Sequence, residues 1–203
     1  MTGSLIVEIT RLRSQGHNTM WNYLTSSALA WARNMSVNMA IKDNYDWLFF
    51  WDADISIESE DGFIEKMIAL AQEKGAGAVG IPYAFKGFPL EWAVRDIDGL
   101  RVVSDVNAGH ELNPLGEGKV ELRQFPIEPY EAKQVGTGTM LIKVDELKKM
   151  TPPWFSFIDG YKDGEVTMWP EDYMFCDQLR KNTKIYADPR FKALHWGQFA
   201  FGI

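Results

Sequence analysis

The sequence predicts an α/β protein. Short segments rich in β-branched and aromatic residues alternate along the chain with segments of helical periodicity, which is the pattern of α/β folds. The composition supports a folded domain, because 46 % of the 203 residues are apolar and 24 % are charged. We therefore expect a single domain over residues 1–203.

The first half of the chain contains three expected strands and two expected helices. In chain order these are a strand at 4–10, a helix from a cap at Thr25 or Ser26 to about Lys42, a strand at 45–51, a helix at 60–73 and a strand at 78–83. The strands are short and rich in β-branched or aromatic residues, and the helices place apolar residues on one face. The strand that ends at Trp51 is an apolar run without alternation, which favours a central strand buried on both faces.

The second half begins with an irregular part. Residues 84–130 are expected to form an insertion rich in loops and short strands, because Gly, Pro and Asn separate short strand-like pieces. After it we expect a strand at 135–144, a helix at 145–150, a loop at 154–170, a helix at 171–181 and a strand at 184–187. Pro152-Pro153 ends the first of these helices, and Pro170 fits the first turn of the second.

Charge and cysteine content limit the partners of the chain. The formal net charge is -7, and an acidic protein lacks the basic stripe with which a nucleic-acid groove neutralises phosphates. A phosphate-bearing small ligand stays compatible, because a bound divalent cation supplies positive charge locally. Cys176 is the only cysteine, so no intrachain disulfide can form, and a cytoplasmic location is expected. No apolar run approaches the ~18 residues of a membrane-spanning helix.

Two carboxylates, Asp52 and Asp54, directly follow the apolar strand. Ligands of parallel α/β sheets bind at the carboxyl ends of the strands, and side chains at i and i+2 of an extended segment point the same way. We therefore expect both carboxylates to hold one Mg²⁺ or Mn²⁺ ion, for which oxygen ligands are suited. The alternative is a solvated turn, or a helix N-cap at Asp54 or Ser56.

Two further groups could carry chemistry. His195 offers an imidazole ligand for such a metal, although a hydrogen-bonded histidine without a ligand is the commoner case. Glu171 and Asp172 begin an expected helix, where the helix dipole favours carboxylates without any function. In a functional reading, one of them is a general base for an acceptor hydroxyl, kept ionised by the dipole and by backbone N–H groups.

Three other features are weaker signals. Gly136-Thr137-Gly138 precedes a strand and would let the backbone approach a ligand closely, or would form an ordinary turn. Arg33 would pair with a phosphate, with a carboxylate of the site, or with solvent on a helix face. Four aromatic residues would stack on a sugar ring, or belong to the core or to the hinge of a lid: Trp154, Phe155, Phe157 and Trp169.

In their order along the chain, these motifs resemble the GT-A glycosyltransferases, especially the small single-domain type of bacteria, phages and viruses. The resemblance spans roughly residues 28–197. It is carried by Ala32-Arg33-Asn34, Trp51-Asp52-Ala53-Asp54, Val79-Gly80-Ile81-Pro82-Tyr83, Gly136-Thr137-Gly138-Thr139-Met140-Leu141-Ile142, Pro153-Trp154-Phe155, Glu171-Asp172-Tyr173-Met174-Phe175-Cys176, Asp188-Pro189 and His195-Trp196-Gly197. It implies a Rossmann-like mixed sheet flanked by helices, and transfer of a sugar from a nucleotide-diphosphate donor to a saccharide or other hydroxyl acceptor.

The resemblance also implies roles for single residues. Asp54 and His195 would bind Mn²⁺ or Mg²⁺, and Asp52 would contact the ribose or the metal. The metal would stabilise charge on the leaving diphosphate. Arg33 would lie near the nucleotide, together with the backbone at 136–138. Glu171 or Asp172 would sit by the acceptor, where an acidic residue is the base in inverting members.

One feature departs from the family pattern. GT-A folds begin with a strand and a helix whose loop holds the nucleotide base, whereas this chain opens with what reads as the second strand. Either the first unit is missing, or residues 1–26 supply it in compressed form. A missing unit would leave an exposed sheet edge, which a partner chain in a homo-oligomer could cover.

Two other functions stay open. The first is a nucleotidyltransferase, which shares the α/β sheet and the paired carboxylates but usually carries a Gly-rich basic loop early in the chain. This sequence has no such loop. The second is a non-catalytic binding or assembly module that has the same fold.

Overall fold

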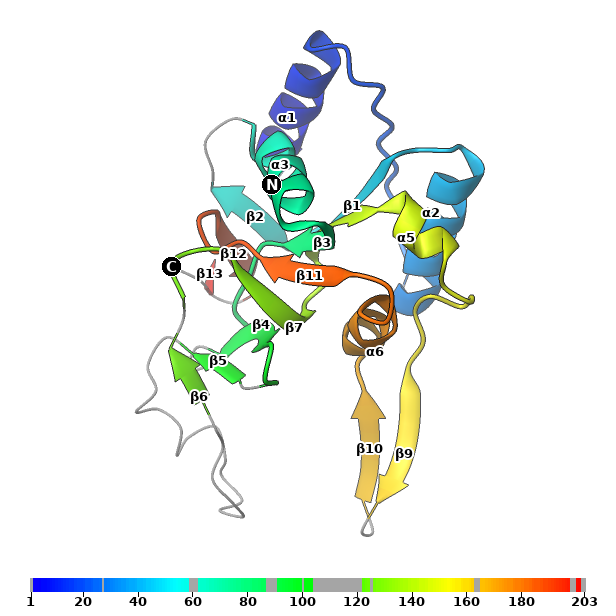
Figure 1. Ribbon diagram of the computed structural model, residues 1–203, viewed down its shortest axis with the longest axis vertical. Coiled ribbons are helices and arrows are strands. Elements are labelled where there is room, and N and C mark those ends of the chain that lie inside the picture. Colours follow the sequence, from blue (N-terminus) through cyan, green and yellow to red (C-terminus); the bar gives the residue numbers. More distant parts are fainter. Residues whose placement is uncertain are drawn as a thin grey trace.

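The computed structural model describes residues 2–26, 28–58, 62–86, 91–99, 101–103, 122–124, 126–162, 165–197 and 200–201. Its centre is an eight-stranded sheet with the order β1-β8-β3-β11-β7-β4-β5-β6 (Figure 1). These strands are β1 (Trp47–Trp51), β3 (Ala76–Gly80), β4 (Glu91–Asp96), β5 (Arg101–Val103), β6 (Leu122–Gln124), β7 (Tyr130–Val135), β8 (Thr139–Lys143) and β11 (Lys184–Ala187). β3 pairs with β11 in parallel, as does β5 with β6, and the other neighbours are antiparallel.

Helices cover both faces of the sheet. One face packs against α2 (Leu29–Lys42), α5 (Val144–Lys148) and α6 (Glu171–Leu179). The other face packs against α3 (Phe63–Lys74) and a small antiparallel sheet of order β13-β12-β2. The small sheet consists of β2 (Ile55–Glu58), β12 (Lys192–Trp196) and β13 (Ala200–Phe201). The predicted fold class, a mixed α/β sheet flanked by helices, is confirmed at this level.

Two apolar clusters lie on the two sides of β8. Met140 and Ile142 pack into the cluster beneath α2 and α6, whereas Leu141 packs into the cluster beneath α3. Alternate side chains of a strand point to opposite faces, so β8 is buried on both. The prediction that β1 is the central strand is wrong, because β1 ends the sheet and pairs with β8 alone. Within β1 only Phe50 is fully buried, and the other side chains are half-buried.

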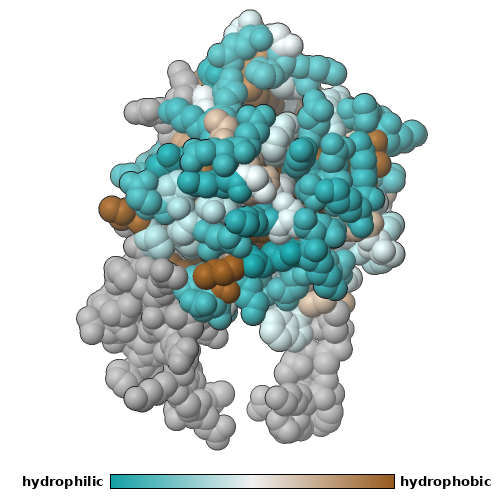
Figure 2. Space-filling model, viewed as in Figure 1, coloured by the Kyte–Doolittle hydropathy of each residue, from teal (hydrophilic) through white to brown (hydrophobic). Residues whose placement is uncertain are grey.

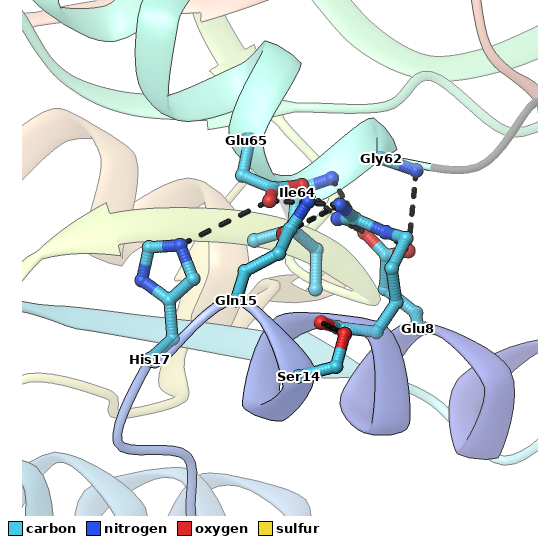
Figure 3. A network of polar contacts seen from close by, with 8 residues as sticks. Glu8, Ser14, Gln15, His17, Gly62, Ile64 and Glu65 are labelled. Atoms are coloured by element: carbon cyan, nitrogen blue, oxygen red, sulfur yellow. Dashed lines mark hydrogen bonds and ion pairs between the residues drawn. The ribbon is translucent and has the colours of Figure 1, made fainter.

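The N-terminal segment is a helix, α1 (Thr2–Ser14), where a strand at 4–10 was predicted. Figure 3 shows Glu8 of α1 facing the start of α3. Its carboxylate accepts hydrogen bonds from the amides of Gly62 at 3.3 Å and Ile64 at 3.2 Å. Arg11, one helical turn later, pairs with Glu8 and with Glu65. A helix places these two residues on one face, and that contact overrides the strand preference of the β-branched residues.

Residues 2–26 contain α1 and, among the described residues, no strand. This segment therefore does not supply the compressed strand–helix unit that the sequence led us to consider. The outer edge of β1 pairs with no strand in the part of the chain that the structure describes. The helix predicted after Thr25 or Ser26 begins later, at Leu29, because Ser26 Oγ accepts the amide of Ala28 at 3.0 Å in a turn before the helix.

Two other segments differ from the sequence prediction, and part of the second lies outside the described residues. The predicted loop at 154–170 contains an antiparallel hairpin of β9 (Ile158–Lys162) and β10 (Glu165–Trp169), which projects from the body beside α6 (Figure 1). The predicted insertion at 84–130 contributes β4, β5 and β6 to the sheet, and its residues 104–121 lie outside the described residues.

The surface shown in Figure 2 is mostly hydrophilic, with only scattered apolar residues. No helix among the described residues has the length and apolar character needed to cross a membrane.

Candidate functional site

The strand β1 ends in a tight turn that contains the two predicted carboxylate ligands. The amide of Ile55 donates a hydrogen bond to the carbonyl oxygen of Asp52 at 3.1 Å, and β2 begins at Ile55. Asp52 and Asp54 therefore belong to a turn, not to the extended segment that was expected. Side chains two residues apart in a turn need not share a direction, and these two carboxylates have different partners.

Asp52 binds a buried arginine. Arg33 of α2 is 4 % exposed, and its Nη2 donates to Oδ2 of Asp52 at 3.1 Å. The same guanidinium donates through Nη1 to Oε1 of Glu171, at the start of α6. A buried charge needs such partners, and low exposure strengthens their attraction. Of the three kinds of partner that the sequence suggested for Arg33, the structure shows it paired with carboxylates of the site.

Asp54 lies beside His195. Pairing of β2 with β12 places His195 opposite Ile55, and the amide of Trp196 donates to the carbonyl oxygen of Asp54 at 2.7 Å. As a result, Nε2 of His195 lies 3.4 Å from Oδ2 of Asp54. The other ring nitrogen, Nδ1, lies 2.9 Å from the carbonyl oxygen of Ala84. In a neutral imidazole this hydrogen bond keeps the proton on Nδ1, so that Nε2 carries the lone pair that a metal ligand needs.

The geometry of Asp54 and His195 fits a divalent cation. Two neighbouring ligands of an octahedral ion, each at about 2.1 Å, lie roughly 3 Å apart. The separation of 3.4 Å between Nε2 and Oδ2 is close to this value. Carboxylate oxygen and imidazole nitrogen are both ligands for such ions. Water and phosphate oxygens would complete the coordination, as is usual for Mg²⁺.

The three predicted ligands do not form one cluster. The described part of the chain contains no group of three or more His, Cys, Asp or Glu side chains placed to hold a metal ion. Asp52 is held instead by Arg33, which leaves Asp54 and His195 as the pair that the structure brings together. The expectation that both aspartates share one ion stays a prediction.

A lysine that sequence reasoning missed also contacts Asp54. Nζ of Lys86 lies 2.6 Å from Oδ2 of Asp54. Partial burial by itself would raise the pKa of Asp54, but the hydrogen bond from Lys86 and the nearby His195 outweigh it and hold the pKa below its ordinary value. Asp54 is thus an ionised carboxylate that is stabilised by positively charged neighbours.

Glycines at 136 and 138 make room for side chains of the site. A Cβ atom on Gly138 would lie 2.8 Å from Oδ2 of Asp52, and one on Gly136 would overlap the ring of Tyr83. The amide of Gly138 donates to the hydroxyl of Tyr83 at 3.3 Å. The side chain of Thr137 is completely buried. The sequence predicted that a ligand would approach the backbone closely at these glycines. In the structure, the side chains of Asp52 and Tyr83 do so.

Tyr83 links the acidic groups of the site. Burial raises the pKa of its hydroxyl, and the carboxylates of Asp172 and Asp52 raise it further. These three groups therefore lie within electrostatic range of one another. The ring of Tyr83 also packs edge-on against His195, with ring centroids 5.2 Å apart. Sequence reasoning placed Tyr83 in a strand and gave it no role, although its position after Pro82, just beyond β3, was a signal for the sheet edge.

Asp172 and Glu171 have different environments. Glu171 is taken up by Arg33, whereas Asp172 accepts the amide of Tyr173 at 2.8 Å. Burial, and then the neighbouring Glu171 carboxylate, raise the pKa of Asp172 to about 6. The helix start and the backbone N–H groups therefore do not lower the pKa of this carboxylate overall, and it is mostly ionised only above about pH 6. A carboxylate with a pKa close to neutrality is suited to accept a proton and release it again.

The four aromatic residues near α6 divide into two groups. Phe155 is buried and stacks on Phe175, with centroids 4.2 Å apart, and Trp154 packs against the same core. Phe157 and Trp169, at the base of the hairpin, are about half exposed, at 45 % and 53 %. Only this second group is available to a ligand.

Comparisons with known proteins locate the fold but not the activity. No protein-family model matches the chain, and no curated protein gives a significant match. Among solved structures, the viral protein A197 from STIV superposes with a TM-score of 0.60 at 21 % sequence identity. The match covers 94 % of this chain and 78 % of that chain. At this level of identity the likeness concerns the fold alone.

Proposed function

We propose that this chain is a glycosyltransferase of the GT-A type, which transfers a sugar from a nucleoside-diphosphate donor to a hydroxyl acceptor. The observation that carries the proposal is the pair formed by Asp54 and His195. Nε2 of the imidazole lies 3.4 Å from the carboxylate oxygen, and the other ring nitrogen is hydrogen-bonded to a backbone carbonyl. The pair lies just beyond β1, and Tyr83, which packs against His195, is within electrostatic range of a further acidic group, Asp172. A site of this kind can bind a metal-bound diphosphate on one side and activate a hydroxyl on the other.

Each residue of the site has a role in this proposal. Asp54 and His195 hold Mn²⁺ or Mg²⁺. When bound, the ion supplies positive charge that stabilises the leaving diphosphate. Asp52, fixed by Arg33, has about a third of its side chain exposed and can accept a hydrogen bond from a ribose hydroxyl. Glu171 positions Arg33 and is not itself a base, because its carboxylate is already engaged.

Asp172 is the general base in this proposal. The acceptor oxygen forms a bond to the anomeric carbon of the donor, and the bond from that carbon to the diphosphate oxygen breaks. The electron pair of the broken bond leaves with the diphosphate, and the hydroxyl proton passes to Asp172. Proton transfer of this kind typically contributes about 10²–10⁴-fold to the rate. A single displacement with one base inverts the configuration of the anomeric carbon.

The exposed aromatic residues support a saccharide as the acceptor. Trp169 ends the hairpin three residues before Asp172, so it lies close in sequence to the proposed base. A half-exposed indole offers an apolar face on which a sugar ring can stack. In this proposal Trp169 therefore binds the acceptor, whereas Asp54 and His195 bind the metal ion of the donor.

Isothermal titration calorimetry tests the proposal. The chain is titrated with UDP, GDP and CDP, each with and without Mn²⁺. We expect one of them to bind only when Mn²⁺ is present, and Asp54→Ala to lose this dependence. A matched control is Asp145→Ala, since Asp145 forms a comparable surface ion pair with Lys148 at 2.9 Å.

Two results would count against the proposal. If no nucleoside diphosphate binds, the chain is better described as a non-catalytic module that has the same fold. If one binds equally well without Mn²⁺ and to Asp54→Ala, the assignment of the metal site fails. Asp145→Ala has to behave as the wild type for either conclusion to hold.

A further inference from the structure

Lys86 occupies the place beside Asp54 that a bound cation would take. Its Nζ lies 2.6 Å from Oδ2 of Asp54, the oxygen that also faces Nε2 of His195 at 3.4 Å. The side chains of Lys86 and Asp54 are 39 % and 46 % exposed, so packing does not force them together. The contact depends on charge, and a stronger cation can therefore displace the ammonium group.

The backbone connects Lys86 to the imidazole of the site. The carbonyl oxygen of Ala84 accepts the hydrogen bond of His195, and Lys86 follows two residues later. Ala84 is itself fixed, because it is completely buried and forms an antiparallel bridge with Trp92. Ala84 is thus held in place beside His195, and the long cationic side chain of Lys86 follows two residues later.

A divalent cation and the Lys86 ammonium cannot share this position. An ion bound to Asp54 would lie about 2.1 Å from its carboxylate oxygen. The ammonium nitrogen lies 2.6 Å from the same oxygen. Both cations would contact the same carboxylate oxygen and would repel each other, and the doubly charged ion gains more from the carboxylate. Lysine has a flexible four-carbon stem and binds phosphates as a point charge, so the displaced group has a second partner within the same site.

We propose that Lys86 is a built-in counter-ion, which holds Asp54 until a divalent cation binds and then moves to the phosphates of the donor. This inference rests on the proposed function, because it needs both a metal at Asp54 and a nucleoside diphosphate in the site. It predicts opposite effects on the two ligands. Loss of the ammonium group frees Asp54 for the metal, and it removes one positive charge from the phosphates.

Calorimetry with the full chain separates these effects. Lys86→Met and Lys86→Arg are compared with the wild type, first with Mn²⁺ alone and then with UDP, GDP and CDP in saturating Mn²⁺. Lys86→Met is expected to bind Mn²⁺ about two- to fivefold more tightly, which is the range of an exposed ion pair. It should bind the preferred nucleoside diphosphate roughly tenfold more weakly, as expected for loss of a charge-assisted contact. Lys86→Arg, which keeps the charge, should remain close to the wild type in both titrations.

A matched control shows that the effects are local. Lys74→Met removes a comparable ion pair on α3, where Nζ of Lys74 lies 2.7 Å from Oε1 of Glu73. Its affinities should equal those of the wild type. Circular dichroism then verifies that each variant is folded, which is expected because Lys86 and Lys74 are both substantially exposed.

The outcomes distinguish this inference from the proposed function. If the wild type and Lys86→Met bind Mn²⁺ equally well, the counter-ion role is overturned and the metal site stands. An unchanged affinity of Lys86→Met for the nucleoside diphosphate overturns the movement to the phosphates. If neither protein binds Mn²⁺, both the inference and the proposed metal site fail. Binding of Mn²⁺ by Lys86→Met alone supports the inference in its strongest form.

Discussion

Nε2 of His195 lies 3.4 Å from Oδ2 of Asp54, although these residues are far apart in the sequence. The antiparallel pairing of β2 with β12 brings them together, and the hydrogen bond from Nδ1 to Ala84 orients the ring. An imidazole with its second nitrogen anchored to a carbonyl oxygen is the usual arrangement of a metal-binding histidine. The predictions below follow from this pair and from the acidic groups around it.

The histidine should be required for metal-dependent binding. We expect His195→Ala to weaken Mn²⁺ binding by at least about tenfold, as loss of a metal ligand or its support does. His17→Ala is the matched control, because His17 is half exposed and lies near Glu65, remote in sequence from the site residues. Calorimetry with Mn²⁺ measures both variants. Equal affinities of His195→Ala and wild type would show that the imidazole is not a ligand.

The transfer activity should depend on the ionisation of Asp172. Its pKa is raised to about 6, first by burial and then by Glu171, and a base must be ionised to accept a proton. The value of kcat/KM is therefore expected to fall below pH 6 and to level off above it, and Asp172→Asn should lose most of the activity. Initial rates between pH 5 and pH 8 measure this profile. A flat profile, or an Asn variant as active as the wild type, would remove Asp172 from the role of base.

The same carboxylate should reduce the stability of the fold at neutral pH. A pKa raised from 3.8 to about 6 means that folding favours the protonated form. The associated stability is present below pH 4 and is lost as the pH rises through 6, by up to roughly 3 kcal/mol. Asp172→Asn is therefore expected to be more stable than the wild type at pH 7, by about 1–3 kcal/mol, and equal to it near pH 4.

Urea unfolding at the two pH values measures this difference. The sign of the change in unfolding free energy at pH 7 is the informative result, since a substitution that lowers activity while raising stability is typical of a functional residue. A variant that is less stable than the wild type at pH 7 would show that burial does not strain this carboxylate.

The buried arginine should be essential for stability. Arg33→Met leaves the carboxylates of Asp52 and Glu171 without their cation, and removal of one member of a buried ion pair typically costs about 3–5 kcal/mol. Arg13→Met is a suitable control, because Arg13 is exposed and bonds only to Thr19 in the contacts that the structure gives. Urea unfolding of both variants checks the prediction. A loss below 1 kcal/mol for Arg33→Met would show that the two carboxylates find other partners.

Much of the fold could be predicted because local pattern and tertiary structure agree. The helix predicted at 60–73 is α3, and the strand at 184–187 coincides with β11. α1 could not be predicted in this way. Its residues prefer a strand, but Glu8 and Arg11 bind the start of α3 and Glu65, and contacts so distant in sequence leave no local signal.

The residues of the candidate site could be predicted from the sequence better than their arrangement in space. Asp54, Asp172 and His195 are marked by their order along the chain. The different partners of Asp52 and Asp54 could not be predicted, because they follow from the turn after β1 and from the burial of Arg33. Lys86 was missed for a similar reason, since only its distance to Asp54 distinguishes it from other surface lysines.

Anomalous diffraction from crystals grown with Mn²⁺ and the preferred nucleoside diphosphate tests the central claim most directly. The account predicts a manganese peak within about 2.0–2.3 Å of both Oδ2 of Asp54 and Nε2 of His195, with diphosphate oxygens completing the coordination. A manganese peak elsewhere, or a bound nucleotide with no peak between these two atoms, would contradict it.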